Sequence, residues 1–357
     1  MLTLEHLLKN PPATEQLYSA DFRLTNTNVN NTLMSRKFCS TLTLIAAVIG
    51  LGSLPLASSA QLNVTNVLTP EQLVQDVLAG PGITITNVVF NGVPSPATPQ
   101  QGSAEFTTGN TNLGISEGII LASGIPAEID GPQTFFADEQ FFTGGDPDLA
   151  ILSGQVISDA AILEFDFVPV GDSLDFSYVF GSEEYPDFAC SNFNDAFGFF
   201  LSGPGINGPF TNNAENIATL PGTALPVSIA NVNGGDPNDP NCNGTNTQYY
   251  VDNAGGLTIA YNGFTVVLQA KAQVQCGQTY HIKLAIGDAF DSSYDSGVFL
   301  EAGSFQSNAI QVEVGGSISG DSSIVEGCSQ ALITFVRPDT IGGADTVIYD
   351  IGGNAIN

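Results

Sequence analysis

The chain has 357 residues, of which 36 are Asp or Glu and only 7 are Lys or Arg, so its formal net charge is -29 at pH 7. A surface this acidic repels nucleic acid and anionic lipid, which excludes those two classes of partner because both bind through basic patches. Hydrophobic residues make up 43% of the chain and fall in short runs, which excludes intrinsic disorder.

Residues 1–60 predict an upstream extension followed by a secretory signal. A short basic stretch after Met34 precedes an apolar run, and a small-residue segment ends at Ala60. This order is that of a signal peptide, and the apolar run is shorter than the roughly 20 residues of a membrane-spanning helix. We predict that translation starts at Met34, that 34–60 is the signal, and that the mature protein is secreted or displayed at the cell surface without other membrane insertion.

One short helix is expected near the start of the mature chain, over 70–79. Pro70 suits a first helical turn, and Leu73, Val74 and Leu78 share one face. The sequence Gly-Pro-Gly that follows ends the helix.

From residue 83 onward, segments of alternating apolar and polar residues, together with short apolar runs such as 118–122 and 196–201, lie between turns rich in Gly, Pro and Asn. The expected strands are 83–90, 118–122, 161–168, 174–180, 196–201, 280–286 and 298–302. We also expect a hairpin over 257–274 that turns at Asn262-Gly263. This pattern predicts an all-β protein, an antiparallel β-sandwich of the jelly-roll or lectin-like kind.

Two domains are expected after the signal. Residues 61–307 suit a single large β-sandwich domain. Residues 308–357 begin another β pattern, with apolar runs at 310–314 and 331–336, and correspond to an incomplete Ig-like domain. We therefore expect the chain to be a fragment of a longer protein.

An exported chain with cysteines is expected to contain disulfides. The cysteines beyond the signal are Cys190, Cys242, Cys276 and Cys328, which allow three pairings. We favour Cys190–Cys242, because both lie in loops rich in Asn and Asp. Such a bridge contributes about 4 kcal/mol in the loop-entropy model.

The first candidate site is an acidic loop between two apolar strands. Its carboxylates are Glu183, Glu184, Asp187 and Asp195. Ca²⁺ takes six to eight oxygen ligands from flexible loops of this kind. The alternative interpretation is that these side chains are solvated loop charges or cap a turn.

A second acidic loop carries Asp288, Asp291 and Asp295. It lacks the EF-hand pattern, but loops at one end of a β-sandwich can still share a calcium ion. Our hypothesis is that the two acidic loops meet and form one Ca²⁺ site. Asp146 and Asp148 are a third, weaker candidate, and the acidity as a whole also suits simple solubility in a salty medium.

The sequence contains few residues or motifs typical of catalysis, so we expect a protein that is not an enzyme. His281 is the only histidine of the mature chain, and its alternating strand suggests an exposed or hydrogen-bonded strand residue. A glycan hydrolase is the enzyme alternative, with Glu183 paired with Asp195 or Asp288.

Aromatic residues gather in or near the loops. They are Tyr185, Phe188, Phe193, Tyr249, Tyr250 and Tyr294. Exposed rings could stack on sugars, but core filling beneath long loops is the interpretation we favour, and the chain has no Trp.

Several long motifs follow one another along the chain. They are VFGSEEYPDF at 179–188, FNDAFGFFLSGPGI at 193–206, YVDNAGG at 250–256, YNGFTVVL at 261–268, TYHIKLAIGDA at 279–289 and YDSGVFLEAGSF at 294–305. Over 61–307 the chain resembles the choice-of-anchor L domain family, and 308–357 is similar to the start of a Calx-β domain. The first resemblance implies an extracellular module of bacterial surface proteins, and it implies no particular activity.

Together these observations predict an extracellular binding or adhesion module, stabilised by calcium, within a larger surface protein. Its ligand would be a surface glycan or a protein. The alternative is a passive spacer that holds another domain away from the cell.

Overall fold

The computed structural model describes residues 62–109, 111–131, 140–141, 143–255 and 258–307, and the backbone of two further strands at 311–315 and 332–336. The predicted upstream extension, the signal and Cys328 lie outside the described residues.

Two antiparallel sheets form the body of 62–307, which confirms the all-β sandwich. The first sheet has the order β1 (Leu62–Thr65), β4 (Ser103–Thr108), β5 (Glu117–Ala122), β16 (Ser296–Glu301), β7 (Ser173–Ser182), β13 (Gly263–Thr265) and β12 (Tyr250–Asp252), and both β14 (Leu268–Gln273) and β17 (Gln306–Ser307) also pair with β7. The second sheet has the order β3 (Val93–Pro94), β2 (Ile83–Phe90), β6 (Ile157–Pro169), β15 (Tyr280–Ala289), β8 (Ala196–Ser202) and β9 (Glu215–Asn216).

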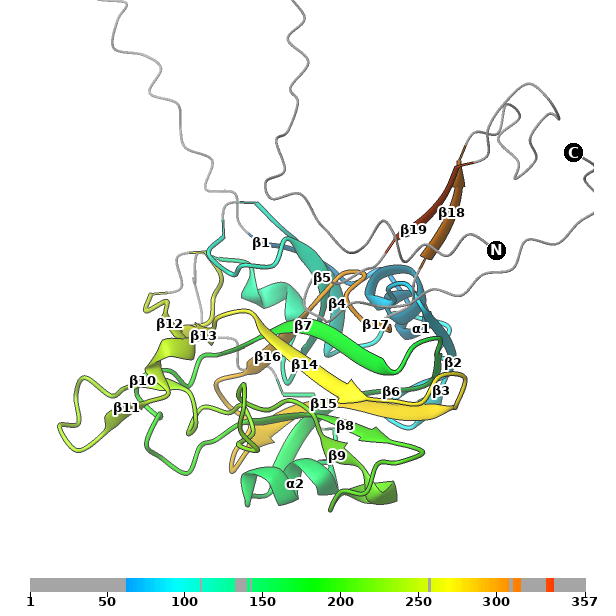
Figure 1. Ribbon diagram of the computed structural model, residues 1–357. Helices are drawn as coiled ribbons and strands as arrows, with labels where there is room; N and C mark the ends of the chain where they lie inside the picture. Colours follow the sequence, from blue (N-terminus) through cyan, green and yellow to red (C-terminus); the bar gives the residue numbers. More distant parts are fainter. Residues whose placement is uncertain are drawn as a thin grey trace, which may run out of the picture. The chain divides into compact units, whose positions relative to one another are not determined.

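Aromatic side chains fill the space between the sheets. Alternation along β7 turns Phe176, Tyr178 and Phe180 to one face. These rings lie 4.8 to 5.7 Å from the rings of Phe197 and Phe199 on β8 in the opposite sheet. Figure 1 shows β7 and β14 lying over β6, β15 and β8. This aromatic core therefore holds the two sheets together. The two acidic loops follow β7 in the first sheet and β15 in the second.

The expected N-terminal helix is confirmed. It comprises α1 (Pro70–Gln72) and a π-helical continuation, Leu73–Leu78. The Thr69 side chain accepts a hydrogen bond from the Gln72 N–H while the Gln72 side chain accepts one from the Thr69 N–H, which is a capping box. Its buried face packs into the main core.

A second helix, α2 (Pro147–Ser153), was not expected from the sequence. Asp146 caps its N-terminus, Pro147 occupies its first turn and Gly154 ends it in the left-handed conformation. Leu149 packs with Phe200 and Ala285 on the outer face of the second sheet, where Figure 1 shows α2 beside β8 and β9.

The shorter elements connect these parts. Single 3₁₀ turns cover Pro126–Ile129, Thr211–Asn213 and Thr247–Tyr249, and a small hairpin pairs β10 (Asn233–Gly235) with β11 (Asn243–Thr245). Beyond the sandwich, β18 (Gln311–Gly315) pairs antiparallel with β19 (Leu332–Val336), at the two apolar runs noted in the sequence.

The predicted hairpin over 257–274 is wrong. The described part of its first arm, 258–262, forms no strand and makes only an isolated bridge from Ile259 to Asp130. β13, after the expected turn, pairs instead with β12 and β7. The Asn253 amide donates hydrogen bonds to the Ile259 and Tyr261 carbonyls, at 3.0 and 2.6 Å. These bonds hold the chain before β13 as an irregular loop, so Asn262-Gly263 ends that loop and does not turn a hairpin.

The favoured disulfide, Cys190–Cys242, is present. It joins the loop after β7 to the β10–β11 hairpin, with a Cα–Cα distance of 5.7 Å and a sequence separation of 52. Cys276 is exposed and forms no disulfide with any described residue.

Candidate functional site

The strand pairing brings the two acidic loops to one end of the sandwich. Ser182 at the end of β7 pairs with Ser296 at the start of β16, and Ala196 at the start of β8 pairs with Gly287 near the end of β15. The β7–β8 and β15–β16 connections therefore leave and re-enter the sheets side by side.

Hydrogen bonds join the two loops directly. The Glu183 N–H donates to the Asp295 carbonyl at 3.2 Å. The Ala289 N–H donates to Asp195 Oδ1 at 2.9 Å, and the Ser296 hydroxyl donates to Asp195 Oδ2 at 2.7 Å. The hypothesis that the two loops meet is confirmed.

Five of the seven acidic residues singled out from the sequence are buried where the loops meet. This set, here called the acidic cluster, is Glu183, Glu184, Asp195, Asp288 and Asp295, each no more than 2% exposed. Asp187 and Asp291 are exposed on the rim. Asp187 accepts a hydrogen bond from Asn238 at 3.4 Å, and Asp291 accepts one from the Ser293 N–H at 3.2 Å.

Burial makes ionisation of the cluster unfavourable. Burial, with Asp195, Asp291 and Glu183 nearby, raises the pKa of Glu184 to about 9. Burial also raises the pKa of Asp195 to about 7, although the Ala289 N–H and the Ser296 hydroxyl oppose that shift. Burial and the adjacent Asp195 and Asp295 raise the pKa of Asp288 well above its ordinary value.

Two members of the cluster lack hydrogen bonds. Neither carboxylate oxygen of Asp288 has a hydrogen-bond partner of normal geometry, and the same holds for Glu184 Oε2. The Ser123 hydroxyl lies beside Asp288 and favours its charged form slightly, but that hydroxyl donates to the Ser296 carbonyl. Buried polar groups without partners are rare, so these oxygens indicate a missing interaction.

The carboxylates are near one another without being arranged as a formed metal centre. Among the described residues, no group of three or more His, Cys, Asp or Glu side chains has the geometry to hold a metal ion. A cation could therefore bind only with some rotation of these side chains.

Several residues around the cluster carried no sequence signal for this site. Asp159 and Ser123 are buried beside it, from β6 and from the turn after β5. Tyr261 is buried near Asp295 and Glu183. Gly124 leaves room for Asp295, because a Cβ at position 124 would overlap that carboxylate. These residues come from distant segments, and only the folded sheets bring them together.

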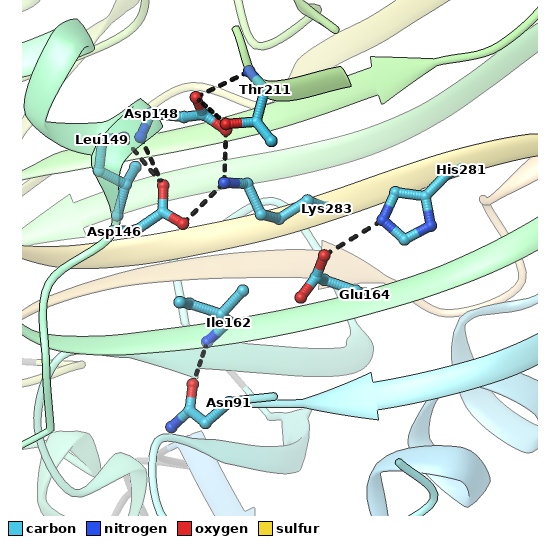
Figure 2. Close-up of polar contacts among 9 residues, drawn as sticks. All are labelled: Asn91, Asp146, Asp148, Leu149, Ile162, Glu164, Thr211, His281 and Lys283. Carbon is cyan, nitrogen blue, oxygen red and sulfur yellow. Dashed lines mark hydrogen bonds and ion pairs between the residues drawn. The ribbon is translucent and has the colours of Figure 1, made fainter. Parts of the chain in front are cut away.

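The third acidic candidate has a different role. Asp146 and Asp148 each accept a hydrogen bond from the buried Lys283 ammonium, at 2.7 and 2.6 Å, as Figure 2 shows. Thr211 donates two further hydrogen bonds to Asp148, both of 2.9 Å. Burial favours a higher pKa for Asp148, but the bonds from Lys283 and Thr211 outweigh it and lower the pKa below its ordinary value.

His281 is a hydrogen-bonded strand residue, as expected. Its Nδ1 lies 2.8 Å from Asp166 and its Nε2 lies 3.1 Å from Glu164. Hydrogen bonding to Glu164, supported by Asp166, raises the His281 pKa against the opposing effect of burial. Both ring nitrogens are thus engaged by carboxylates, which does not favour a role as a catalytic base.

Four aromatic residues form a ledge on the rim of the acidic cluster. Phe188 contacts Phe193 and Tyr294, with ring centroids 5.2 and 5.5 Å apart, and Phe193 contacts Phe290 at 5.0 Å. We call Phe188, Phe193, Phe290 and Tyr294 the aromatic ledge. Phe290 is 58% exposed, whereas Tyr185 is buried and donates a hydrogen bond to the Val232 carbonyl.

The part of the chain that contains this site matches a known protein family. Residues 61–306 match the family model of the choice-of-anchor L domain. The chain belongs to the choice-of-anchor L domain family. No curated protein and no solved structure matches it.

The choice-of-anchor L match includes both acidic loops, the aromatic ledge and the Lys283 ion pairs. Membership of the family indicates a surface-associated or secreted module. Among the described residues, no helix is long and apolar enough to cross a membrane. The resemblance of 308–357 to a Calx-β domain is not confirmed, since the match ends at residue 306.

Proposed function

We propose that this choice-of-anchor L domain is a non-enzymatic binding or adhesion module at the cell surface. Its ligand is a surface glycan or a surface protein, and the aromatic ledge is the contact. The single observation that carries this proposal is the conformation of Phe290. A large apolar side chain is exposed there on a backbone with φ of +86°.

Such a backbone conformation is unfavourable for a bulky residue. Non-glycine residues at positive φ are uncommon and cost on the order of 1–3 kcal/mol, and they cluster where binding requires a particular geometry. Tyr294 in the same loop has φ of +64°. Two strained aromatic residues in one loop therefore support a role in contacting a ligand, since burial in the core does not explain the exposure of Phe290.

The enzyme alternative receives no support from the geometry. A glycan hydrolase needs its two carboxylates to reach the sugar. Glu183, Asp195 and Asp288 are each no more than 2% exposed, so a sugar ring has no access to them. The passive spacer remains as the alternative that predicts no ligand.

The test uses the full chain against immobilised glycans and bacterial surface extracts. We expect Phe290→Ala to abolish binding, because it removes the exposed ring. Val170→Ala is the matched control, since Val170 is 51% exposed and follows β6 at the opposite end of the strand from the acidic cluster. Equal binding by wild type and Phe290→Ala would refute the role of the ledge, and no binding by wild type would favour the spacer.

A further inference from the structure

We propose that the acidic cluster is a divalent-cation site selective for Ca²⁺, with Glu184, Asp195, Asp288 and Asp295 as its protein ligands and Glu183 beside them. The exposed Asp187 and Asp291 are not part of the ligand set. This inference concerns the structure of the loop end and does not depend on whether the aromatic ledge binds a ligand.

The first step is the balance of charge. Five carboxylates lie together in the interior, and burying charges of one sign without a counter-charge is strongly unfavourable. Among the described residues the Lys and Arg side chains are Lys271, which is exposed on β14, and Lys283, which is bound to Asp146 and Asp148.

The second step is the missing hydrogen bonds. Both oxygens of Asp288 and Glu184 Oε2 are buried without a hydrogen-bond partner of normal geometry, and these residues are each 1% exposed. The charges of Asp195 and Asp295 act on Asp288, and those of Asp195, Asp291 and Glu183 act on Glu184. Both side chains are thus buried close enough to Asp195 for its charge to act on them.

The third step is the orientation of Asp195. Its two oxygens are held by the Ala289 N–H from one loop and by the Ser296 hydroxyl from the start of β16. Donors of this kind fix the direction of a metal-ligating carboxylate while leaving lone pairs for the ion. The oxygens of Asp288 and Glu184 Oε2 have no hydrogen bond of normal geometry to hold them, so they are less constrained than the oxygens of Asp195.

The chemistry of the donors selects the ion. All the proposed ligands are carboxylate oxygens, which hard cations prefer, whereas zinc prefers nitrogen and sulfur ligands. Ca²⁺ accepts six to eight oxygens in irregular geometry, whereas Mg²⁺ requires a regular octahedron and keeps several waters. A crowded, buried group of carboxylates from two loops therefore favours Ca²⁺.

The test is calorimetric titration of the chelator-treated full chain with CaCl₂ and, separately, with MgCl₂. We expect saturable Ca²⁺ binding and weaker Mg²⁺ binding. Asp288→Asn should abolish the Ca²⁺ signal, and Glu184→Gln provides a second variant with the same expectation. Asp187→Asn is the matched control from the same loop and should bind as wild type does.

Thermal unfolding distinguishes a ligand from a purely structural residue. In chelator, Asp288→Asn should be at least as stable as wild type, because the substitution removes one of several like charges. In CaCl₂ only the wild type should gain stability. Absence of Ca²⁺ binding by wild type, or wild-type binding by Asp288→Asn, would overturn the proposal. Phe290→Ala should retain full Ca²⁺ binding, so failure of the ledge and failure of the cation site give different results.

Discussion

Two groups of buried carboxylates in this sandwich differ in how their charge is balanced. On the outer face of the second sheet, Lys283 lies between Asp146 and Asp148 at hydrogen-bonding distance. At the loop end, five carboxylates lie together and no Lys or Arg among the described residues reaches them. The comparison teaches that buried carboxylates form a self-contained ion pair where the chain supplies a cation. At the loop end burial instead raises the pKa values of the carboxylates, and we propose that an external cation balances their charge.

The largest loss of stability is expected when the internal cation, Lys283, is removed. Lys283→Met keeps much of the packing against Phe200 but leaves Asp146 and Asp148 buried without a counter-charge. We expect the free energy of unfolding in urea to fall by about 3–5 kcal/mol. Lys271→Met, at an exposed position, should change it by no more than about 0.5 kcal/mol. Equal effects of the two substitutions would contradict this account of the ion pair.

The second prediction concerns the constraint on the loop that carries Glu184. Cys190 lies in that loop, and its disulfide to Cys242 closes a segment of 52 positions. Replacing both cysteines by Ser should lower the free energy of unfolding by about 2–4 kcal/mol and weaken Ca²⁺ binding. Cys276→Ser is the control, because Cys276 forms no disulfide with a described residue. Unchanged Ca²⁺ binding in the double variant would show that the loop holds its conformation without the bridge.

The third prediction concerns a substitution that introduces a steric clash in the acidic cluster. A methyl group at Gly124 would overlap the Asp295 carboxylate, so Gly124→Ala should cost about 1–3 kcal/mol and reduce Ca²⁺ affinity. Gly144→Ala is the control, because a Cβ at position 144 meets no atom within 4 Å. Denaturant unfolding and calorimetric titration measure the two effects, and an intact Ca²⁺ affinity in Gly124→Ala would exclude Asp295 as a ligand.

The smallest expected effect is the pH dependence of His281. Its pKa is raised in the folded state by Glu164 and Asp166, so the protonated ring stabilises the fold at low pH. This stabilisation is complete below the unfolded-state pKa of about 6.5 and is lost as pH rises through the raised value. Because the side chain is 34% exposed, solvent screening limits the effect to about 1 kcal/mol or less. Asp195 and Glu184 titrate in the same pH range, so the measurement is the difference between the stability–pH profiles of wild type and His281→Gln. That difference should equal the His281 contribution, and identical profiles would contradict it.

The sheets were predictable because burial on one face imposes a period of two. The strands around Phe165 and Phe176 follow from that alternation, whereas the strand around Phe197 follows from an unbroken apolar run that is buried on both faces. The helix at 147–153 was missed although Asp146-Pro147 is a recognisable helix start, because the two aspartates were interpreted as metal ligands. The prediction of a hairpin over 257–274 was wrong because Asn253 holds the loop before β13 through hydrogen bonds that no local sequence pattern reveals.

The candidate site was predictable in part. The spacing of Glu183, Glu184 and Asp195 indicated the first acidic loop, and the second acidic loop lies beside it as predicted. Spacing does not determine which side chains turn inward, so the exposed Asp187 and Asp291 were not separated from the buried set. Ser123 and Gly124 reach the cluster only through the β5–β16 pairing, which is a property of the fold.

The central claim is that the acidic cluster takes its counter-charge from outside the chain. A crystal structure of the chain grown with CaCl₂ tests it most directly. We predict an anomalous density peak with calcium–oxygen distances of about 2.3–2.6 Å to Asp288 and Glu184. A cluster without such a peak, in which those carboxylates bond to one another through shared protons, would contradict the claim.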